Sequence, residues 1–170
     1  MKLGAYIEIK ILVKAKHFDN VIFLGNVRCP VTWIASLNNC YKLYQHNVEN
    51  GEFISRENAA NRCKDASSTL ASITSDDEQD LIGSLTDQKM WIGGKLDAQG
   101  GRWTWDDGND FLLDQYWSAG DKEGNNGLCN YMYENNKWGD ANCTDTNVPK
   151  IKNFVCKKTR KYHSIRVFTK

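Results

Sequence analysis

The six cysteines, at positions 29, 40, 63, 129, 143 and 156, constrain the fold of this chain more than any other feature. No two of them form a Cys-x-x-Cys pair, and the histidines at 17, 46 and 163 stand at no metal-ligand spacing, which argues against a zinc site. An even count without metal spacing favours three disulfides in a secreted or extracellular protein, with reduced cytosolic thiols as the alternative. Spacing alone does not choose among the pairings that six cysteines allow.

Length and charge limit the classes of protein that remain. A chain of 170 residues suits one domain, or one domain with short extensions. Its formal net charge of +1 gives no reason to expect a nucleic-acid partner. The charge is uneven, because nine acids and only two lysines lie between Asp106 and Asp145. Residues 159–170 are basic, and we interpret them as a solvated tail, with a polyanion-binding strip as the alternative.

The N-terminal residues 1–26 are predicted to form a strand-like extension. Apolar side chains alternate from residue 5 to residue 15, and a second apolar run at 21–24 suggests a hairpin. The apolar face would be covered by the main domain's sheet, by a second copy in a dimer, or by a preceding domain. Charged residues such as Glu8 and Lys10 interrupt any signal-peptide core, so the export route stays open. No run reaches the roughly 18 apolar residues of a membrane span.

Two helices are predicted in the first half of the main domain. Residues 55–64 suit a helix with Ser55 as its N-cap. A second helix begins after Ser75, which forms a capping box with Glu78. Leu81, Ile82 and Leu85 form the predicted buried face of this helix, because they recur at helical spacing.

The second half of the chain has the pattern of short strands around a long loop. Residues 91–94 and 103–105 are predicted strands, and residues 130–133 and 153–156 are predicted closing strands. Between them, residues 106–126 are rich in Gly, Asp and Asn and show little periodicity. Loops longer than about 15 residues without regular structure are usually functional or disordered, and the flanking cysteines and aromatic residues argue against disorder.

These elements occur in an order that resembles the C-type lectin domain family, over about residues 27–158. The motifs that carry the resemblance are Cys29-Pro30, Trp33, Cys40-Tyr41, Ala59-Ala60 with Cys63, Leu70-Ala71-Ser72-Ile73, Trp91-Ile92-Gly93, Trp103-Thr104-Trp105, Asp107-Gly108, Trp117, Cys129, Trp138-Gly139-Asp140, Cys143 and Phe154-Val155-Cys156. The resemblance implies an α+β fold with two helices, two small, mainly antiparallel sheets and a long loop region that carries the ligand site. It also implies the disulfides Cys63–Cys156 and Cys129–Cys143, with Cys29–Cys40 marking the long form that has an N-terminal hairpin.

The resemblance further implies a place for calcium, which takes about six to eight oxygen ligands. Sugar-binding members use a Glu-Pro-Asn or Gln-Pro-Asp tripeptide in the long loop, an acid shortly before the next cysteine, and an Asn-Asp pair after a tryptophan. Here the tripeptide falls on residues 121–123 or, shifted by two, on residues 123–125, and neither version contains proline. Gly127-Leu128 supplies no acid, and Gly139 replaces the Asn of the pair.

The predicted ligand-binding and calcium-holding residues are therefore Asp121, Glu123, Asn125 and Asp140, with Asn126 as a substitute. The alternative is that these are solvated loop acids and turn-forming residues.

The aromatic residues have two interpretations. Trp91, Trp103 and Trp138 are predicted to belong to the core. Core packing is also the preferred interpretation for Trp117 and for the pair at 131 and 133, with stacking on a sugar ring as the alternative.

The sequence thus predicts an extracellular binding module that presents a long-loop site to a carbohydrate or glycoprotein, with calcium as a candidate cofactor. The alternative is a calcium-independent domain that recognises a protein ligand. No catalytic Ser/His/Asp or Cys/His constellation is visible, so an enzyme is not predicted.

Overall fold

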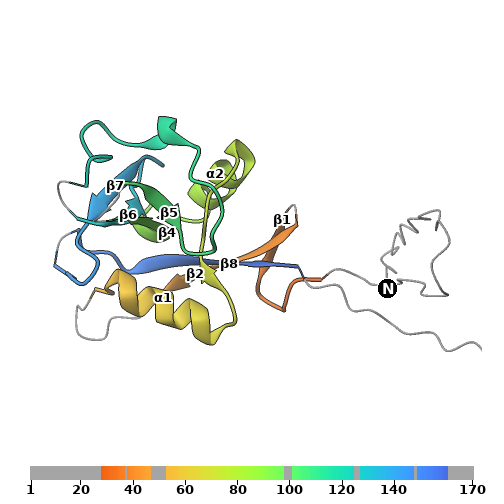
Figure 1. Cartoon of the computed structure of the whole chain (residues 1–170). Coiled ribbons are helices and arrows are strands. Elements are labelled where there is room, and N and C mark those ends of the chain that lie inside the picture. The colour runs from red at the N-terminus through yellow and green to blue at the C-terminus, as the bar shows by residue number, and fades with distance from the viewer. Residues whose placement is uncertain are drawn as a thin grey trace, which may run out of the picture. The chain divides into compact units, whose positions relative to one another are not determined.

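The computed structural model describes residues 28–36, 38–46, 53–97, 101–124, 127–147 and 149–160 (Figure 1). These residues belong to one compact unit, Arg28–Lys161. The predicted extension 1–26 with its strand at 5–15, the tail beyond Arg160, and both Asn125 and Asn126 lie outside the described residues. The domain boundaries and the dimer contact through residues 5–15 stay predictions.

Both predicted helices are present, and each begins at the predicted cap. Helix α1 spans Arg56–Asp65, and the Ser55 hydroxyl accepts a hydrogen bond from the Asn58 amide at 3.2 Å. Helix α2 spans Asp76–Gly83, and the Ser75 hydroxyl accepts from the Glu78 amide at 3.2 Å. Such bonds satisfy amides that have no partner within the helix. In the described part of the chain, no helix is long and apolar enough to cross a membrane.

The strands form two groups that share one hydrogen-bonded network. The first group comprises β1 (Ile34–Ser36), β2 (Asn39–Gln45), β3 (Thr69–Leu70) and β8 (Asn153–Thr159); the second comprises β4 (Met90–Leu96), β5 (Trp103–Trp105), β6 (Cys129–Met132) and β7 (Trp138–Ala141). Pairing within each group is antiparallel. A short parallel pairing of β8 with β4 joins them in the order β1-β2-β8-β4-β6-β7, with β3 on β8 and β5 on β4. In Figure 1 the β2–β8 pair lies between α1 and the β4–β7 group.

Tryptophans dominate the core, as predicted. Trp91 and Trp138 are fully buried, and each indole finds a hydrogen-bond partner: Trp91 Nε1 donates to the Ile54 carbonyl at 2.7 Å, and Trp138 Nε1 donates to Gln79 Oε1 at 2.9 Å. Trp103 and Trp117 are buried too, with ring centroids 4.6 Å apart. The preferred interpretation of Trp117 as a core residue is therefore confirmed.

Three disulfides join all six cysteines in the pairing that the resemblance implies. Cys63–Cys156 links α1 to β8, Cys129–Cys143 links β6 to the segment after β7, and Cys29–Cys40 links β2 to the chain before β1. The α+β class and its two helices are likewise confirmed.

Candidate functional site

The long loop that follows β5 is held against the tryptophan core. Trp103 Nε1 donates to the Lys122 carbonyl at 2.8 Å, which fixes the far part of the loop to β5. The Ser118 amide donates to the Trp138 carbonyl at 2.9 Å. Phe111, near the start of the loop, packs on Trp105 with ring centroids 4.4 Å apart. The loop is therefore an anchored surface, although the short 3₁₀ turn Asp114–Tyr116 is the only regular element among its described residues.

Three of the four predicted site residues are brought near one another at the end of this loop. Asp121 is half-buried, and the Tyr133 hydroxyl donates to its Oδ2 at 3.1 Å. Asp140 lies buried in β7, and the Gly127 amide donates to its Oδ2 at 3.3 Å. Glu123 is exposed. We call Asp121, Glu123, Tyr133 and Asp140 the long-loop cluster; the fourth predicted residue, Asn125, lies outside the described residues.

The charges of this cluster act on one another. Burial raises the pKa of the Asp121 carboxyl above its ordinary value, and the negative charges of Asp140 and Glu123 raise it further, against the hydrogen bond from Tyr133. Burial also raises the pKa of the Tyr133 hydroxyl, so this group stays protonated at neutral pH and acts as a donor. The result is a patch of carboxylate acceptors in which the Tyr133 O–H is already donated to Asp121.

The described part of the cluster does not have the form of a calcium site. Among the residues that the structure describes, no group of three or more His, Cys, Asp or Glu side chains is arranged to hold a metal ion. A Cβ atom at Gly139 would lie 2.6 Å from Tyr133 Cε2 and 2.8 Å from Tyr131 Cζ, so two tyrosine rings fill the space that an asparagine there would need. Calcium requires a shell of oxygen ligands, and here an amide and a hydroxyl point at the carboxylates instead.

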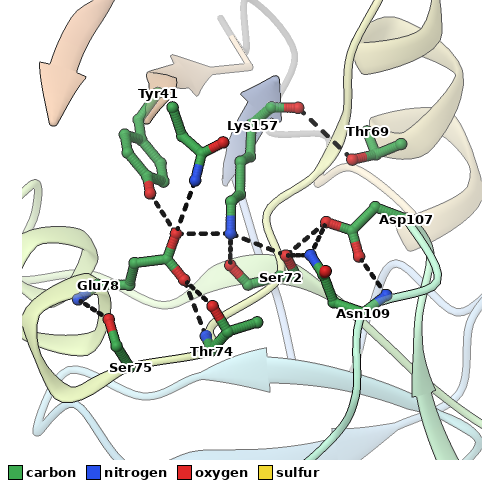
Figure 2. Close-up of polar contacts among 10 residues, drawn as sticks. Tyr41, Thr69, Ser72, Thr74, Ser75, Glu78, Asp107, Asn109 and Lys157 are labelled. Carbon is green, nitrogen blue, oxygen red and sulfur yellow. Dashed lines mark hydrogen bonds and ion pairs between the residues drawn. The ribbon is translucent and has the colours of Figure 1, made fainter. Parts of the chain in front are cut away.

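A second polar group, which the sequence analysis did not predict, surrounds a buried ion pair (Figure 2). Lys157 Nζ lies 2.5 Å from Glu78 Oε1, and the two residues are only 5% and 2% exposed. The Tyr41 hydroxyl also donates to Glu78 Oε1, and the amide and hydroxyl of Thr74 donate to Oε2, each at 2.8 Å. Burial alone would raise the pKa of Glu78, but the hydrogen bonds from Lys157, Tyr41 and Thr74 outweigh it and hold that pKa below its ordinary value.

This arrangement corrects the predicted capping box. Ser75 caps the helix as expected, but the Glu78 carboxylate bonds to Thr74, one residue before the cap, and turns toward Lys157. No spacing rule could have found this pair, since Glu78 lies in α2 and Lys157 in β8. The predicted closing strand at 153–156 ends one residue before Lys157, so the sequence carried no signal for this pair.

The ion pair is connected to two surface residues in the turn after β5. Lys157 Nζ donates to the carbonyl and the hydroxyl of Ser72, at 3.2 and 3.0 Å. The Ser72 hydroxyl in turn donates to Asp107 Oδ2 at 2.5 Å, and Asn109 Nδ2 donates to the same oxygen at 2.9 Å. Figure 2 shows these contacts as a continuous chain from Glu78 to Asn109. We call it the Glu78–Lys157 network.

The chain is similar in sequence to known lectins. The model of the family described as "Lectin C-type domain" matches residues 53–158. Lectin BRA-2 of Megabalanus rosa is 29% identical over 136 residues, which cover 79% of this chain and 72% of that protein.

Solved structures have the same fold. The C-type carbohydrate-recognition domain of cow CD23, determined in the presence of a GlcNAc2Man3 oligosaccharide, superposes with a TM-score of 0.69 at 24% identity, over 80% of this chain and 99% of that one. A calcium-independent type II antifreeze protein gives a TM-score of 0.66 at 22% identity, over 81% and 99%. At these identities the likeness shows the fold alone, and it confirms the fold that the motifs imply.

Proposed function

This chain belongs to the C-type lectin domain family, whose members are binding modules rather than enzymes, and we propose that it binds a carbohydrate or glycoconjugate through its long-loop cluster without calcium. We also propose that it acts outside the cell, because three disulfides suit an oxidising compartment. Calcium as a cofactor, and the ligand set Asp121, Glu123, Asn125 and Asp140, stay predictions that the experiment below tests.

The observation that carries the proposal is the set of carboxylate acceptors that the anchored loop and strand β7 bring together. Sugar hydroxyls are hydrogen-bond donors, so they can pair with the carboxylates of this cluster. A carboxylate has about four lone-pair sites, so Asp121 can accept a sugar hydroxyl while it keeps its bond from Tyr133. Exposed Glu123 adds a second acceptor. The Cys129–Cys143 disulfide and the Trp103 contact hold the loop before binding, which lowers the cost of ordering it.

The packing around Gly139 favours binding without calcium. A side chain at this position would require the rings of Tyr131 and Tyr133 to move. The Tyr133 hydroxyl and the Gly127 amide already donate to one oxygen each of Asp121 and Asp140, where a cation would otherwise bind. A protein with the same fold is described as calcium-independent, so this scaffold does not require the ion.

The test is a glycan array probed in millimolar calcium and in chelator. We expect the same glycans to bind under both conditions, the Asp121→Asn/Glu123→Gln variant to lose them, and Asp87→Asn, which changes an exposed acid outside the cluster, to retain them. Binding that disappears in chelator would overturn the calcium-free mode. So would a rise in the unfolding midpoint on adding calcium, because a ligand that binds only the folded state stabilises it.

The second candidate function is calcium-independent recognition of a protein ligand. Leu112 and Leu128 are 72% and 39% exposed, so each offers apolar area that a protein partner would bury. An array on which the unmodified protein binds no glycan would overturn the carbohydrate proposal in favour of this one.

A further inference from the structure

A polar pocket of about 390 Å³ lies apart from the long-loop cluster and shares no residue with it. It opens between the C-terminal end of α1, strands β3 and β8, and the turn after β5. Its volume is within the range of small-molecule sites, about 300–1,000 Å³. Every side chain that lines it is an amine, an amide, a hydroxyl or a carboxylate. A pocket with these groups and the aliphatic stems of its lysines suits a ligand that presents hydroxyls as well as the apolar face of a ring.

One wall of the pocket is held in place by the Glu78–Lys157 network (Figure 2). The ammonium of Lys157 has three donors, and Glu78 and Ser72 accept from it, so Lys157 supports the wall. Asp107 and Asn109 then stand at the surface with their side chains fixed: Asp107 accepts from Ser72, and the Asn109 amide nitrogen donates to Asp107 Oδ2 at 2.9 Å. Asn109 Nδ2 also donates to the Ser72 hydroxyl oxygen at 3.2 Å, so both of its N–H groups are used. The Asp107 carboxylate and the Asn109 side-chain oxygen, fixed side by side, are suited to accept from neighbouring sugar hydroxyls.

The opposite wall carries positive charge. Exposed Lys64 comes from α1, and Lys158 from β8, where its ammonium donates to the Ala66 carbonyl at 3.0 Å and lies 4.0 Å from the centroid of the Trp33 ring. The ammonium of Lys157 is neutralised by Glu78. The lining carries three lysines against one aspartate, and Glu78 balances one of the lysines, so the pocket favours a ligand with one negative group.

We propose that this pocket is a second binding site, and that it takes one acidic sugar unit. Asp107 and Asn109 bind its hydroxyls, and Lys64 and Lys158 bind its sulfate or carboxylate group. Charge-assisted hydrogen bonds are about twice as strong as neutral ones, so the acidic group contributes much of the affinity. The site does not depend on the proposed function of the long loop.

The test is a two-dimensional NMR titration of the whole chain with N-acetylglucosamine 6-sulfate, neutral N-acetylglucosamine and inorganic sulfate. We expect the sulfated sugar to shift the amides of residues 64–69 and 107–109, and to bind at least about tenfold more tightly than the other two probes. Asn109→Ala and Lys64→Gln should each weaken binding by about tenfold. Lys152→Gln, which changes an exposed lysine outside the lining, and the long-loop variant Asp121→Asn/Glu123→Gln should leave it unchanged.

Each of the following results would overturn the proposal. Equal binding of inorganic sulfate would mean a simple anion site, and equal binding of the neutral sugar would remove the role of the lysines. Loss of the shifts in the long-loop variant, with no loss in Asn109→Ala, would place the ligand in the long loop. No shift with any probe would show that the pocket has no such ligand. Lys64 is exposed, so its variant tests the site even if Asn109→Ala fails to fold.

Discussion

Replacing Lys157 by methionine should be among the most destabilising single changes in this domain that leave the hydrophobic core intact. The change leaves the Glu78 carboxylate, which is only 2% exposed, without the ammonium that lies 2.5 Å from it. Removing one partner of a buried ion pair costs about 3–5 kcal/mol. We expect a loss of about 3 kcal/mol, the lower end, because Tyr41 and Thr74 still donate to Glu78. This is a large part of the roughly 5–15 kcal/mol by which a domain is stable.

The assay is urea unfolding at pH 7, followed by tryptophan fluorescence, for the unmodified protein, Lys157→Met, Glu78→Gln and the double variant. We expect the free energy of unfolding of the double variant to fall by about 1–3 kcal/mol less than the sum of the two single losses. The reason is that the second change removes a partner that is already unpaired. Lys95→Met is the matched control, since Lys95 is 51% exposed and lies 3.9 Å from Asp106. An exposed pair of this kind contributes at most about 1 kcal/mol.

The stability that Lys157→Met loses should also depend on pH, and the direction of this dependence follows from the lowered pKa of Glu78. A carboxyl whose pKa is lower in the folded state contributes stability above its ordinary value of 4.5, and this contribution disappears as the pH falls through the lowered value. The penalty of Lys157→Met should therefore be larger at pH 7 than at pH 3. Three outcomes would refute the role of the pair. One is a loss below about 1 kcal/mol in Lys157→Met, and another is a double variant whose loss equals the sum of the two single losses. The third is a penalty of Lys157→Met that is the same at both pH values.

Three further changes test other parts of the structure. Removing the Cys63–Cys156 disulfide, which spans 93 residues, should cost about 4–5 kcal/mol in urea, against about 3 kcal/mol for Cys29–Cys40, which spans 11; equal losses would contradict the loop-length argument. Asp121→Asn should raise the free energy of unfolding at pH 7, because burial disfavours the charged carboxyl in the folded state. It should give no gain below pH 3.8, where the carboxyl is protonated, and a lower free energy of unfolding at pH 7 would contradict this reasoning. Gly127→Ala places a Cβ 2.0 Å from a backbone carbon and should lower the thermal midpoint well below that of Gly120→Ala, whose Cβ meets nothing within 4 Å; similar midpoints would show that the loop adapts.

Local features of the fold were predictable because short segments of sequence determine them. Ser55 and Ser75 cap the two helices where the sequence places them, since a cap depends only on amides within the next three residues. The strand that contains Trp91 follows from a short apolar run closed by glycines, and the strand that contains Trp103 follows from alternating aromatic and polar residues. The disulfides were predictable only through the resemblance to a family, because cysteine spacing by itself allows many pairings.

The candidate site was predictable only in part. The sequence indicated which loop acids to consider, and the fold places Asp121 and Asp140 close enough for their charges to interact. Nothing in the sequence indicated that the rings of Tyr131 and Tyr133 would occupy the space beside Gly139. That packing depends on the registry of β6 with β7, which sets Tyr131 opposite Gly139.

The sequence by itself determined the class of this protein: its disulfide content, its helix starts, the positions of β4, β5, β6 and β8, and its long loop. Only the tertiary structure decided which polar groups meet. Glu78 joins Lys157, and through Ser72 the pair fixes Asp107 at a pocket wall. The physical reason is that caps and alternation act between neighbours in the chain, whereas a buried charge is stable only beside a partner that folding brings from a distant segment.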